Sequence, residues 1–113
     1  MTARRFANVT LEVCERPDGG AEVVLRGELD LEDAARVDAA LAAVQAGAPV
    51  LVLNLREVTF IDSSGARVIW AGHVRARDAG GRLTVLVAPG AVRRALALTG
   101  LDGELNVVET PGG

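Results

Sequence analysis

The sequence Thr59-Phe60-Ile61-Asp62-Ser63-Ser64-Gly65 joins an apolar stretch to a helical pattern that continues to about Asp78. An acid, two hydroxyls and a glycine therefore follow directly on the end of a predicted strand. Because the binding sites of α/β sheets lie at the carboxyl ends of strands, this junction is a candidate site. A simpler interpretation is that Ser63 only caps the helix, since serine and aspartate are favoured at that position.

A helix N-terminus offers unpaired N–H groups and the positive end of the helix dipole, which together suit a phosphate. A phosphorylated serine carries a charge of about −1.5 to −2 at neutral pH. We therefore expect that a phosphate at this junction would be tolerated by the fold and would still change the surface strongly.

The segment before the junction predicts a strand, a helix and a hairpin. Residues 50–55 are mostly apolar, as expected of a central strand covered on both sides. Asp30 is a plausible N-cap for the preceding helix, which Gly47 and Pro49 end. The apolar stripe of that helix is Leu31, Ala34, Ala35, Val37, Ala40, Leu41 and Val44. Residues 9–15 and 21–27, joined by a Gly-rich turn, predict an antiparallel hairpin.

The segment after the junction continues the alternation. Gly80-Gly81 ends the second helix, and a buried strand is predicted at 83–87, a third helix at 91–98 and a last strand at 105–108. The order β-β-α-β-α-β-α-β predicts an α/β domain, with a mixed, mostly parallel sheet, an N-terminal antiparallel hairpin and helices packed against the sheet. We expect residues 1–113 to form one domain, with a core of about 9–108.

Composition excludes several classes of function. All 12 basic residues are arginine, the net charge is −3, and no basic patch of the kind that binds nucleic acid is apparent. No apolar segment is long enough to span a membrane, and the N-terminus lacks a secretory signal, so we expect no membrane association and a cytoplasmic protein. The single Cys14 and single His73 argue against a metal site, and no cofactor is expected.

Catalysis by this chain is also not expected. His73 lies ten positions beyond Ser63 on the same predicted helix, about 15 Å along its axis, so it cannot activate that serine. The chain has no lysine and therefore no phosphate-binding loop. The alternative of an enzyme with an unrecognised serine nucleophile is therefore disfavoured, because the serine has no base.

Five further motifs occur along the chain: Gly27-Glu28-Leu29-Asp30-Leu31, Val52-Leu53-Asn54-Leu55, Val58 to Gly65, Gly80-Gly81-Arg82-Leu83 and Leu98-Thr99-Gly100-Leu101. In this order they resemble the STAS domain of bacterial anti-sigma-factor antagonists. The resemblance covers about residues 9–108, and the Asp-Ser-Ser-Gly element is its most specific part.

The resemblance implies a binding module that is not an enzyme. Members of the family bind an anti-sigma factor that is also a serine kinase, are released when that kinase phosphorylates the serine after the aspartate, and are reset by a serine phosphatase. On this pattern Ser63 is the phosphoacceptor, with Asp62 beside it and Asp30 close to the same surface. ATP is then the substrate of the partner.

The helix after the junction predicts further contacts. Arg67 and Trp70 fall near the line of Ser63, away from the face that carries Ala66 and Ile69. Tryptophan is enriched at interface hot spots, so Trp70 is a candidate contact. Together with the surface around the phosphoacceptor that the resemblance implies, the residues expected to contact the partner are Asp30, Asp62, Ser64, Gly65, Arg67 and Trp70. A Trp70 half-buried against a neighbouring loop is the equally weighted alternative.

Two departures and one alternative role remain. Many relatives have leucine where Ala66 stands. Many also have a further helix after the last strand. Without that helix, we expect one face of the sheet to be exposed unless neighbouring helices cover it. STAS-like domains also occur as accessory subunits of transport systems or of stress-signalling assemblies. The intact Asp-Ser-Ser-Gly element favours the antagonist role over that alternative.

Overall fold

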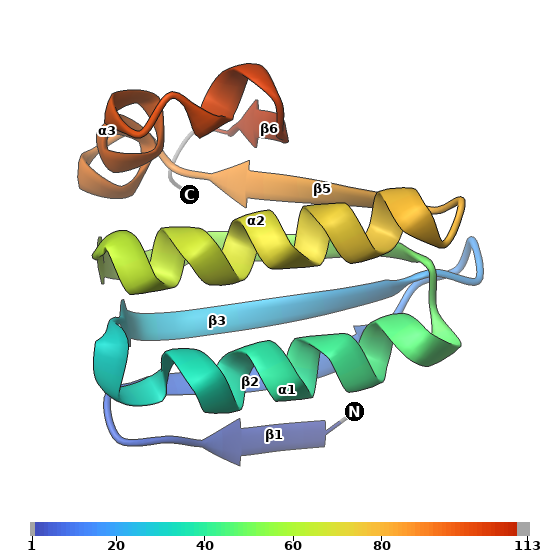
Figure 1. The fold of residues 1–113 in the computed structure, drawn as a ribbon. Helices are drawn as coiled ribbons and strands as arrows, with labels where there is room; N and C mark the ends of the chain where they lie inside the picture. Colours follow the sequence, from blue (N-terminus) through green and yellow to red (C-terminus); the bar gives the residue numbers. More distant parts are fainter. Residues whose placement is uncertain (1, 111–113) are drawn as a thin grey trace.

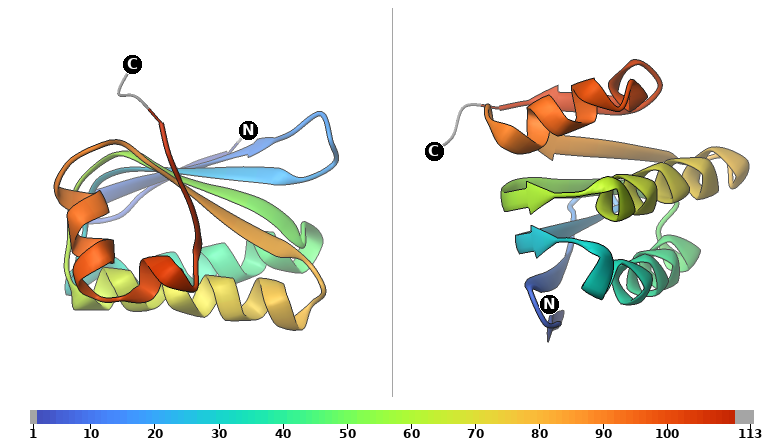
Figure 2. Two further views of the ribbon diagram at one scale, coloured as in Figure 1. Left: turned by 90° about the horizontal axis from the view of Figure 1, so that it is seen from above. Right: turned by 60° about the vertical axis from the view of Figure 1, so that its left-hand side comes forward.

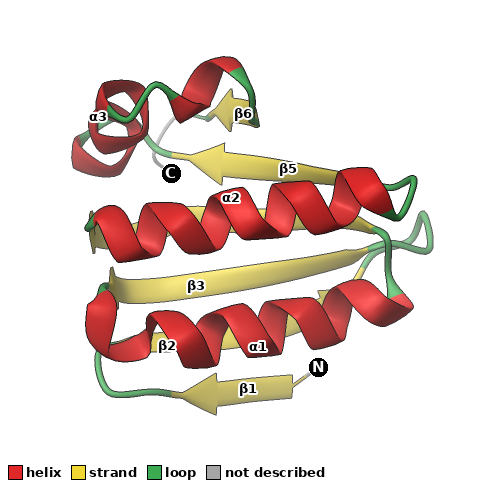
Figure 3. Ribbon diagram, viewed as in Figure 1, coloured by secondary structure: helices red, strands yellow, loops and turns green. Residues whose placement is uncertain are grey.

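Six strands of one sheet lie side by side in the order in which they occur along the chain (Figure 1). The computed structural model describes residues 2–110, and of residues 2 and 102 only the backbone. Figure 3 distinguishes the strands from the helices that connect them. The elements are β1 (Thr2–Arg5), β2 (Val9–Glu15), β3 (Ala21–Leu29), α1 (Leu31–Gly47), β4 (Val50–Ile61), α2 (Ser63–Asp78), β5 (Arg82–Val87), α3 (Ala91–Leu98), the 3-10 helix η1 (Leu101–Gly103) and β6 (Asn106–Glu109).

The sheet is mixed, as the sequence predicts. β1, β2 and β3 are antiparallel, whereas β3 to β6 are parallel and are connected through helices. The α/β class and the N-terminal hairpin of β2 and β3 are thus confirmed. β1 was not predicted, because its four residues include two arginines and show no alternation of apolar and polar side chains.

The helices lie on one face of the sheet, as Figure 2 shows in the view from above. The expectation that the central strand is covered on both faces is therefore wrong. Along β4, Leu51, Leu53 and Leu55 are buried beneath the helices, whereas the alternate residues Val52 and Asn54 are only half-buried. An aliphatic run can thus belong to a one-sided sheet when valine occupies the open face.

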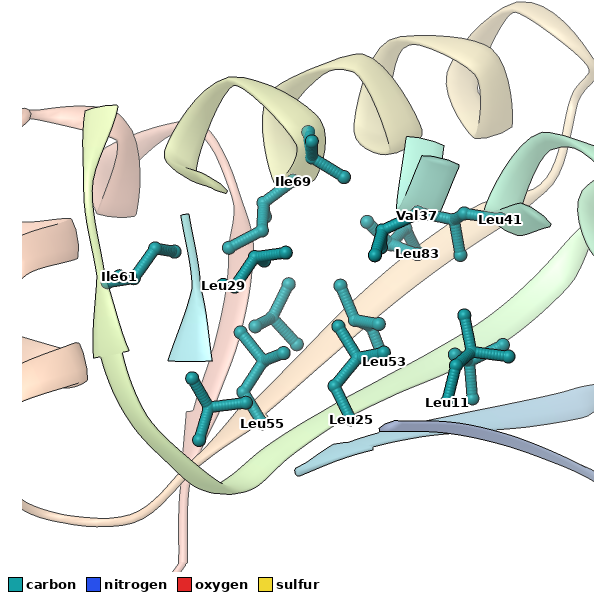
Figure 4. Packing of buried hydrophobic residues seen from close by; sticks show 14 of the residues in the cluster. Leu11, Leu25, Leu29, Val37, Leu41, Leu53, Leu55, Ile61, Ile69 and Leu83 are labelled. Carbon is teal, nitrogen blue, oxygen red and sulfur yellow. The ribbon is translucent and has the colours of Figure 1, made fainter. Parts of the chain in front are cut away.

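The core between sheet and helices is aliphatic, as the low aromatic content requires. Leu25, Leu53 and Val37 have at most 1% of their surface exposed. Figure 4 shows these side chains filling the space between strands and helices, together with Ile69 from α2. Trp70 packs against the edge of this cluster and is only partly buried.

Two features of the strands position the site. β4 runs on to Ile61, well beyond the predicted 50–55, and so carries the chain to the start of α2. In β3, Gly27 has φ +109° and lies so close to Asn8 that a Cβ there would be 2.4 Å from the Asn8 carbonyl oxygen. Only glycine combines that φ with that approach.

No helix in residues 2–110 has the length and apolar character needed to cross a membrane.

Candidate functional site

The N-terminal cap of α2 is Asp62. Its backbone is extended, with φ −105° and ψ −172°, and its carboxylate accepts a hydrogen bond from the Gly65 N–H at 3.0 Å. The prediction of Ser63 as the cap is therefore wrong, since Ser63 is the first helical residue. A carboxylate at the cap also gains from the positive end of the helix dipole, which a serine hydroxyl does not.

The two serines of the junction differ in accessibility. Ser63 is exposed, and its hydroxyl has no hydrogen-bond partner among the described residues. Ser64 is half-buried and lines a groove together with residues of α1. Because Asp62 supplies the cap, the Ser63 hydroxyl remains available at the surface.

Asp62 also connects its own helix to α1. Its second carboxylate oxygen accepts a hydrogen bond from the Leu31 N–H at 3.1 Å, and its own N–H donates to the Leu29 carbonyl at 3.4 Å. The turn that begins α1 and the turn that begins α2 are thereby joined at one end of the sheet. The expectation that the residues around Asp30 and Asp62 share one surface agrees with this geometry.

Asp30 is the N-cap of α1, as predicted. Its carboxylate accepts a hydrogen bond from the Glu32 N–H at 3.2 Å. The side-chain amide of Asn8, from the loop between β1 and β2, donates to Asp30 at 3.2 Å and to Glu32 at 3.0 Å. The β1–β2 loop therefore holds the N-terminus of α1 from the other side.

Asp33, in the first turn of α1, is a buried carboxylate that was not singled out from the sequence. It is fully buried and accepts hydrogen bonds from the backbone N–H groups of Ala7 (3.1 Å) and Asn8 (2.7 Å) and from Arg36 (2.7 Å). Burial by itself would raise the pKa of Asp33, but the two backbone donors and Arg36 outweigh it and hold that pKa below its usual value.

A signal for the burial of Asp33 was present in the sequence. Val37 and Leu41 follow it at i+4 and i+8, and both are buried. The predicted stripe instead included Leu31 and Ala35, which are exposed in the structure.

Gly65 lies beneath the surface of the site. It is buried, and a Cβ at this position would be 2.5 Å from the Leu29 carbonyl oxygen and 2.6 Å from Ile61. Its position favours a packing role, in which the absent side chain allows α2 to begin close to the ends of β3 and β4.

Arg67 and Trp70 occupy different environments. Arg67 is exposed one helical turn after Ser63. Trp70 is half-buried, packs against the core, and has its ring centroid 5.3 Å from that of His73. Trp70 is thus half-buried, as the alternative expected, but it packs against the core cluster and beside His73 of its own helix. The contact of either residue with a partner remains a prediction.

Two exposed apolar side chains flank the junction and were not singled out from the sequence. Leu31, whose N–H binds Asp62, is 75% exposed, and Phe60 at the end of β4 is 47% exposed. A large apolar residue at the first position of a helix or at the end of a strand is the signal that could have identified them. Both leave apolar surface in contact with water close to the Asp62 cap.

Elsewhere the surface has a hollow of about 500 Å³ near the C-terminal end of α2, lined by residues that include His73, Arg77 and Arg82. None of the predicted site residues lines it. Within residues 2–110, no group of three or more His, Cys, Asp or Glu side chains is placed to hold a metal ion.

Comparison with known proteins identifies the family. The family model described as "Mlab, STAS domain" matches residues 14–109. An anti-sigma factor antagonist from Mycobacterium paratuberculosis is 32% identical, with a TM-score of 0.81 over 90% of this chain and 86% of that one. A putative anti-sigma factor antagonist from Thermotoga maritima is 26% identical, with a TM-score of 0.75 over 88% and 86%.

The fold extends to a more distant protein. The Bacillus cell fate determinant SpoIIAA, solved in its phosphorylated form, is 19% identical, with a TM-score of 0.67 over 88% of this chain and 90% of that one. At 19% identity, this likeness shows a shared fold and nothing about function. The family match and the likeness to the mycobacterial antagonist carry the assignment, and the chain belongs to the STAS domain family.

Proposed function

We propose that this chain is a cytoplasmic anti-sigma factor antagonist that binds an anti-sigma factor with serine kinase activity. Phosphorylation of Ser63 by that kinase releases the complex, and a serine phosphatase restores the binding form. The chain itself needs no cofactor, because the ATP is bound by the kinase.

The likeness to two proteins described as anti-sigma factor antagonists supports the general role. That a protein of the same fold was solved in a phosphorylated form supports a modification in this fold. The single observation that carries the choice of residue is the exposed Ser63 hydroxyl, which directly follows the carboxylate that caps α2.

The chemistry at Ser63 is a phosphoryl transfer. The Ser63 oxygen attacks the γ-phosphorus of ATP held by the kinase, the bond to the bridging oxygen breaks, and ADP leaves while the hydroxyl proton passes to a base of the kinase. Hydrolysis of the phosphoserine by the phosphatase consumes water and returns the hydroxyl and inorganic phosphate. This chain contributes an accessible nucleophile on a rigid helix end.

The phosphate would act on the surface through its charge. It would lie at the N-terminus of α2, which favours an anion, and beside the carboxylates of Asp62 and Asp30, which increase the local negative charge. Asp30, Asp62, Ser64, Gly65, Arg67 and Trp70 remain the proposed docking set. Within it, the buried Gly65 acts by allowing α2 to begin close to β3, and the variant Trp70→Ala decides whether Trp70 contacts the partner or supports the helix.

The test combines capture of the partner with identification of the modified residue. The chain is used to isolate an ATPase-fold kinase from its own organism, and the two are incubated with ATP and analysed by mass spectrometry. We expect phosphate on Ser63, its loss in Ser63→Ala and its retention in the matched control Ser64→Ala. A phosphate on Ser64 that persists in Ser63→Ala would disprove the assignment.

The same isolation separates the antagonist role from the accessory-subunit role. Recovery of a transporter subunit, with no kinase and no phosphorylation of either serine, would replace the proposed function by that alternative.

A further inference from the structure

A groove of about 320 Å³ separates α1 from α2 next to the junction. Its floor is apolar and is made largely of small side chains from both helices, among them Ala34 and Ala35 of α1 and Ala71 of α2. α1 and α2 pack against each other, and the groove lies where alanines occupy positions that larger side chains would fill.

The groove begins at the turn that carries Ser63. Ser64, the next residue, lines it, and so does Leu31, whose N–H is held by Asp62. Leu31 is 75% exposed, which leaves a large apolar side chain in water at the mouth of an apolar groove. A partner side chain that entered the groove and covered Leu31 would remove apolar surface of this chain and of the partner from water.

The rim of the groove has one available positive charge. Asp38 is on the rim but pairs with Arg75 at 3.0 Å. Arg67 is exposed, and it forms no ion pair with any acidic side chain that the structure describes. The groove therefore suits an apolar side chain that has a carboxylate near it.

We infer that this groove receives an apolar side chain of the anti-sigma factor, and that a carboxylate of the same partner pairs with Arg67. The inference rests on the proposed function and identifies where that partner docks. Two observations select this occupant over others: the groove begins at the turn that carries the proposed phosphoacceptor, and the charge of Arg67 at its rim is complementary to a carboxylate.

The position of Arg67 also explains how a phosphate outside the groove would affect binding inside it. Ser63 and Arg67 are four residues apart on one helix, so their side chains are neighbours on its surface. A phosphate on Ser63 would attract the Arg67 guanidinium and repel the carboxylate of the partner. Phosphorylation and release are thereby coupled through one side chain.

The test measures the affinity of the unphosphorylated protein for the isolated anti-sigma factor by titration calorimetry. Leu31→Ala removes the apolar side chain at the mouth, and Ala35→Trp fills the groove. We expect each to lower the affinity at least about tenfold. The matched controls are Leu98→Ala, at a leucine that is 88% exposed on α3, and Ala43→Trp, at an exposed alanine outside the groove lining of α1; these should change the affinity less than about twofold.

Arg67→Gln tests the charge. It should weaken binding and reduce the dependence of the affinity on salt concentration, because one charge pair no longer contributes. It should also reduce the effect of Ser63 phosphorylation on affinity. A urea midpoint close to that of the wild type, measured for every variant, shows that the fold is intact.

The outcomes are distinguishable. If the wild type binds the anti-sigma factor and is phosphorylated, but the groove variants bind equally well, the inference is wrong and the proposed function stands. If the wild type neither binds such a kinase nor is phosphorylated by it, both the proposed function and the inference are wrong. If Ala35→Trp instead abolishes self-association of the chain in light scattering, the occupant is a second copy and the inference is wrong.

Discussion

The carboxylate of Asp62 accepts a hydrogen bond from the backbone N–H of Leu31 at 3.1 Å while its other oxygen caps α2 at Gly65. One side chain thus holds the N-termini of two helices that are far apart in the sequence. The position of Ser63 relative to α1, and therefore to the groove between the helices, depends on this carboxylate.

Asp62→Ala should lower the free energy of unfolding by about 1–2 kcal/mol, at the upper end of the range for loss of an N-cap, because two N–H groups lose their partner. Asp62→Asn keeps one acceptor oxygen and should cost less. Urea unfolding followed by circular dichroism measures both. The control is Asp78→Ala at the exposed C-terminal end of α2, and a loss no greater than that of the control would contradict the double-cap role.

Gly65 and Gly47 form a matched pair of helical glycines for testing the packing at the junction. A Cβ at Gly65 would lie 2.5 Å from the Leu29 carbonyl oxygen, whereas a Cβ at Gly47 would meet nothing within 4 Å. We expect Gly65→Ala to destabilise the protein by about 1–3 kcal/mol, the usual cost of overpacking. Gly47→Ala should be neutral or stabilising by up to about 1 kcal/mol.

Thermal and urea unfolding of the two glycine variants measures the difference. Equal stability of both would show that α2 can move away from β3 without cost. It would also remove the argument that glycine is required at position 65 for packing.

The elements with a clear period could be predicted from the sequence. The hairpin of β2 and β3, the cap at Asp30 and the alternation of strands and helices each follow from local patterns. Local patterns do not show which of two neighbouring residues becomes the cap. Asp62 and Ser63 are both good caps, and only the three-dimensional position of the Leu31 N–H gives the Asp62 carboxylate a second partner.

The same limit explains the other errors at the site. Asp33 was not singled out because its partners, the N–H groups of Ala7 and Asn8, belong to a loop about 25 residues earlier in the chain. Leu31 was assigned to the buried stripe because it is apolar, but its place at the start of α1 leaves it beyond the edge of the sheet-facing side. Exposure of a leucine is a tertiary property that the local pattern of apolar residues does not contain.

Asp33→Asn should destabilise the protein at neutral pH by about 1.5–3 kcal/mol, because a charged acceptor of three hydrogen bonds is replaced by an amide whose NH₂ would face donors. The folded-state pKa of Asp33 is lowered, so its ionised form contributes stability above the pKa of the unfolded chain, about 3.9. That contribution is lost as the pH falls through the lower, folded-state pKa.

Urea unfolding of wild type and Asp33→Asn at several pH values checks this prediction. The difference in unfolding free energy should be constant between about pH 7 and 5 and should decrease below about pH 4. The backbone N–H of Gly20 also lowers the pKa of Asp18, but Asp18 is present in both proteins and its effect cancels. A difference that does not change down to pH 3 would contradict the role of the ionised carboxylate.

Ser63→Glu should leave the melting temperature nearly unchanged while it weakens binding of the anti-sigma factor. The side chain at position 63 is exposed, and a carboxylate in the first turn of a helix is favourable, so the fold should tolerate the charge. Ser63→Gln is the matched neutral control and should retain more of the affinity. A large loss of stability in Ser63→Glu alone would show that charge at this position acts through unfolding.

Trp70→Ala separates docking from packing in a single variant. The ring is half-buried, packs against the core cluster and lies 5.3 Å from the ring of His73, so we expect its loss to lower the free energy of unfolding. Truncation of a fully buried tryptophan costs about 3–5 kcal/mol, and about 1–3 kcal/mol is expected for one that is partly exposed.

The affinity of the folded fraction then decides the second role of Trp70. Affinity is measured well below the melting temperature and in stabilising osmolyte, where the variant is folded, alongside Val74→Ala as a smaller truncation one turn further along α2. If Trp70 acts only by packing, the urea midpoint falls and the folded protein binds the anti-sigma factor as the wild type does. An unchanged midpoint with a loss in affinity of about thirtyfold, the effect of an interface hot spot of about 2 kcal/mol, would instead make Trp70 a direct contact and extend the docking surface beyond the groove.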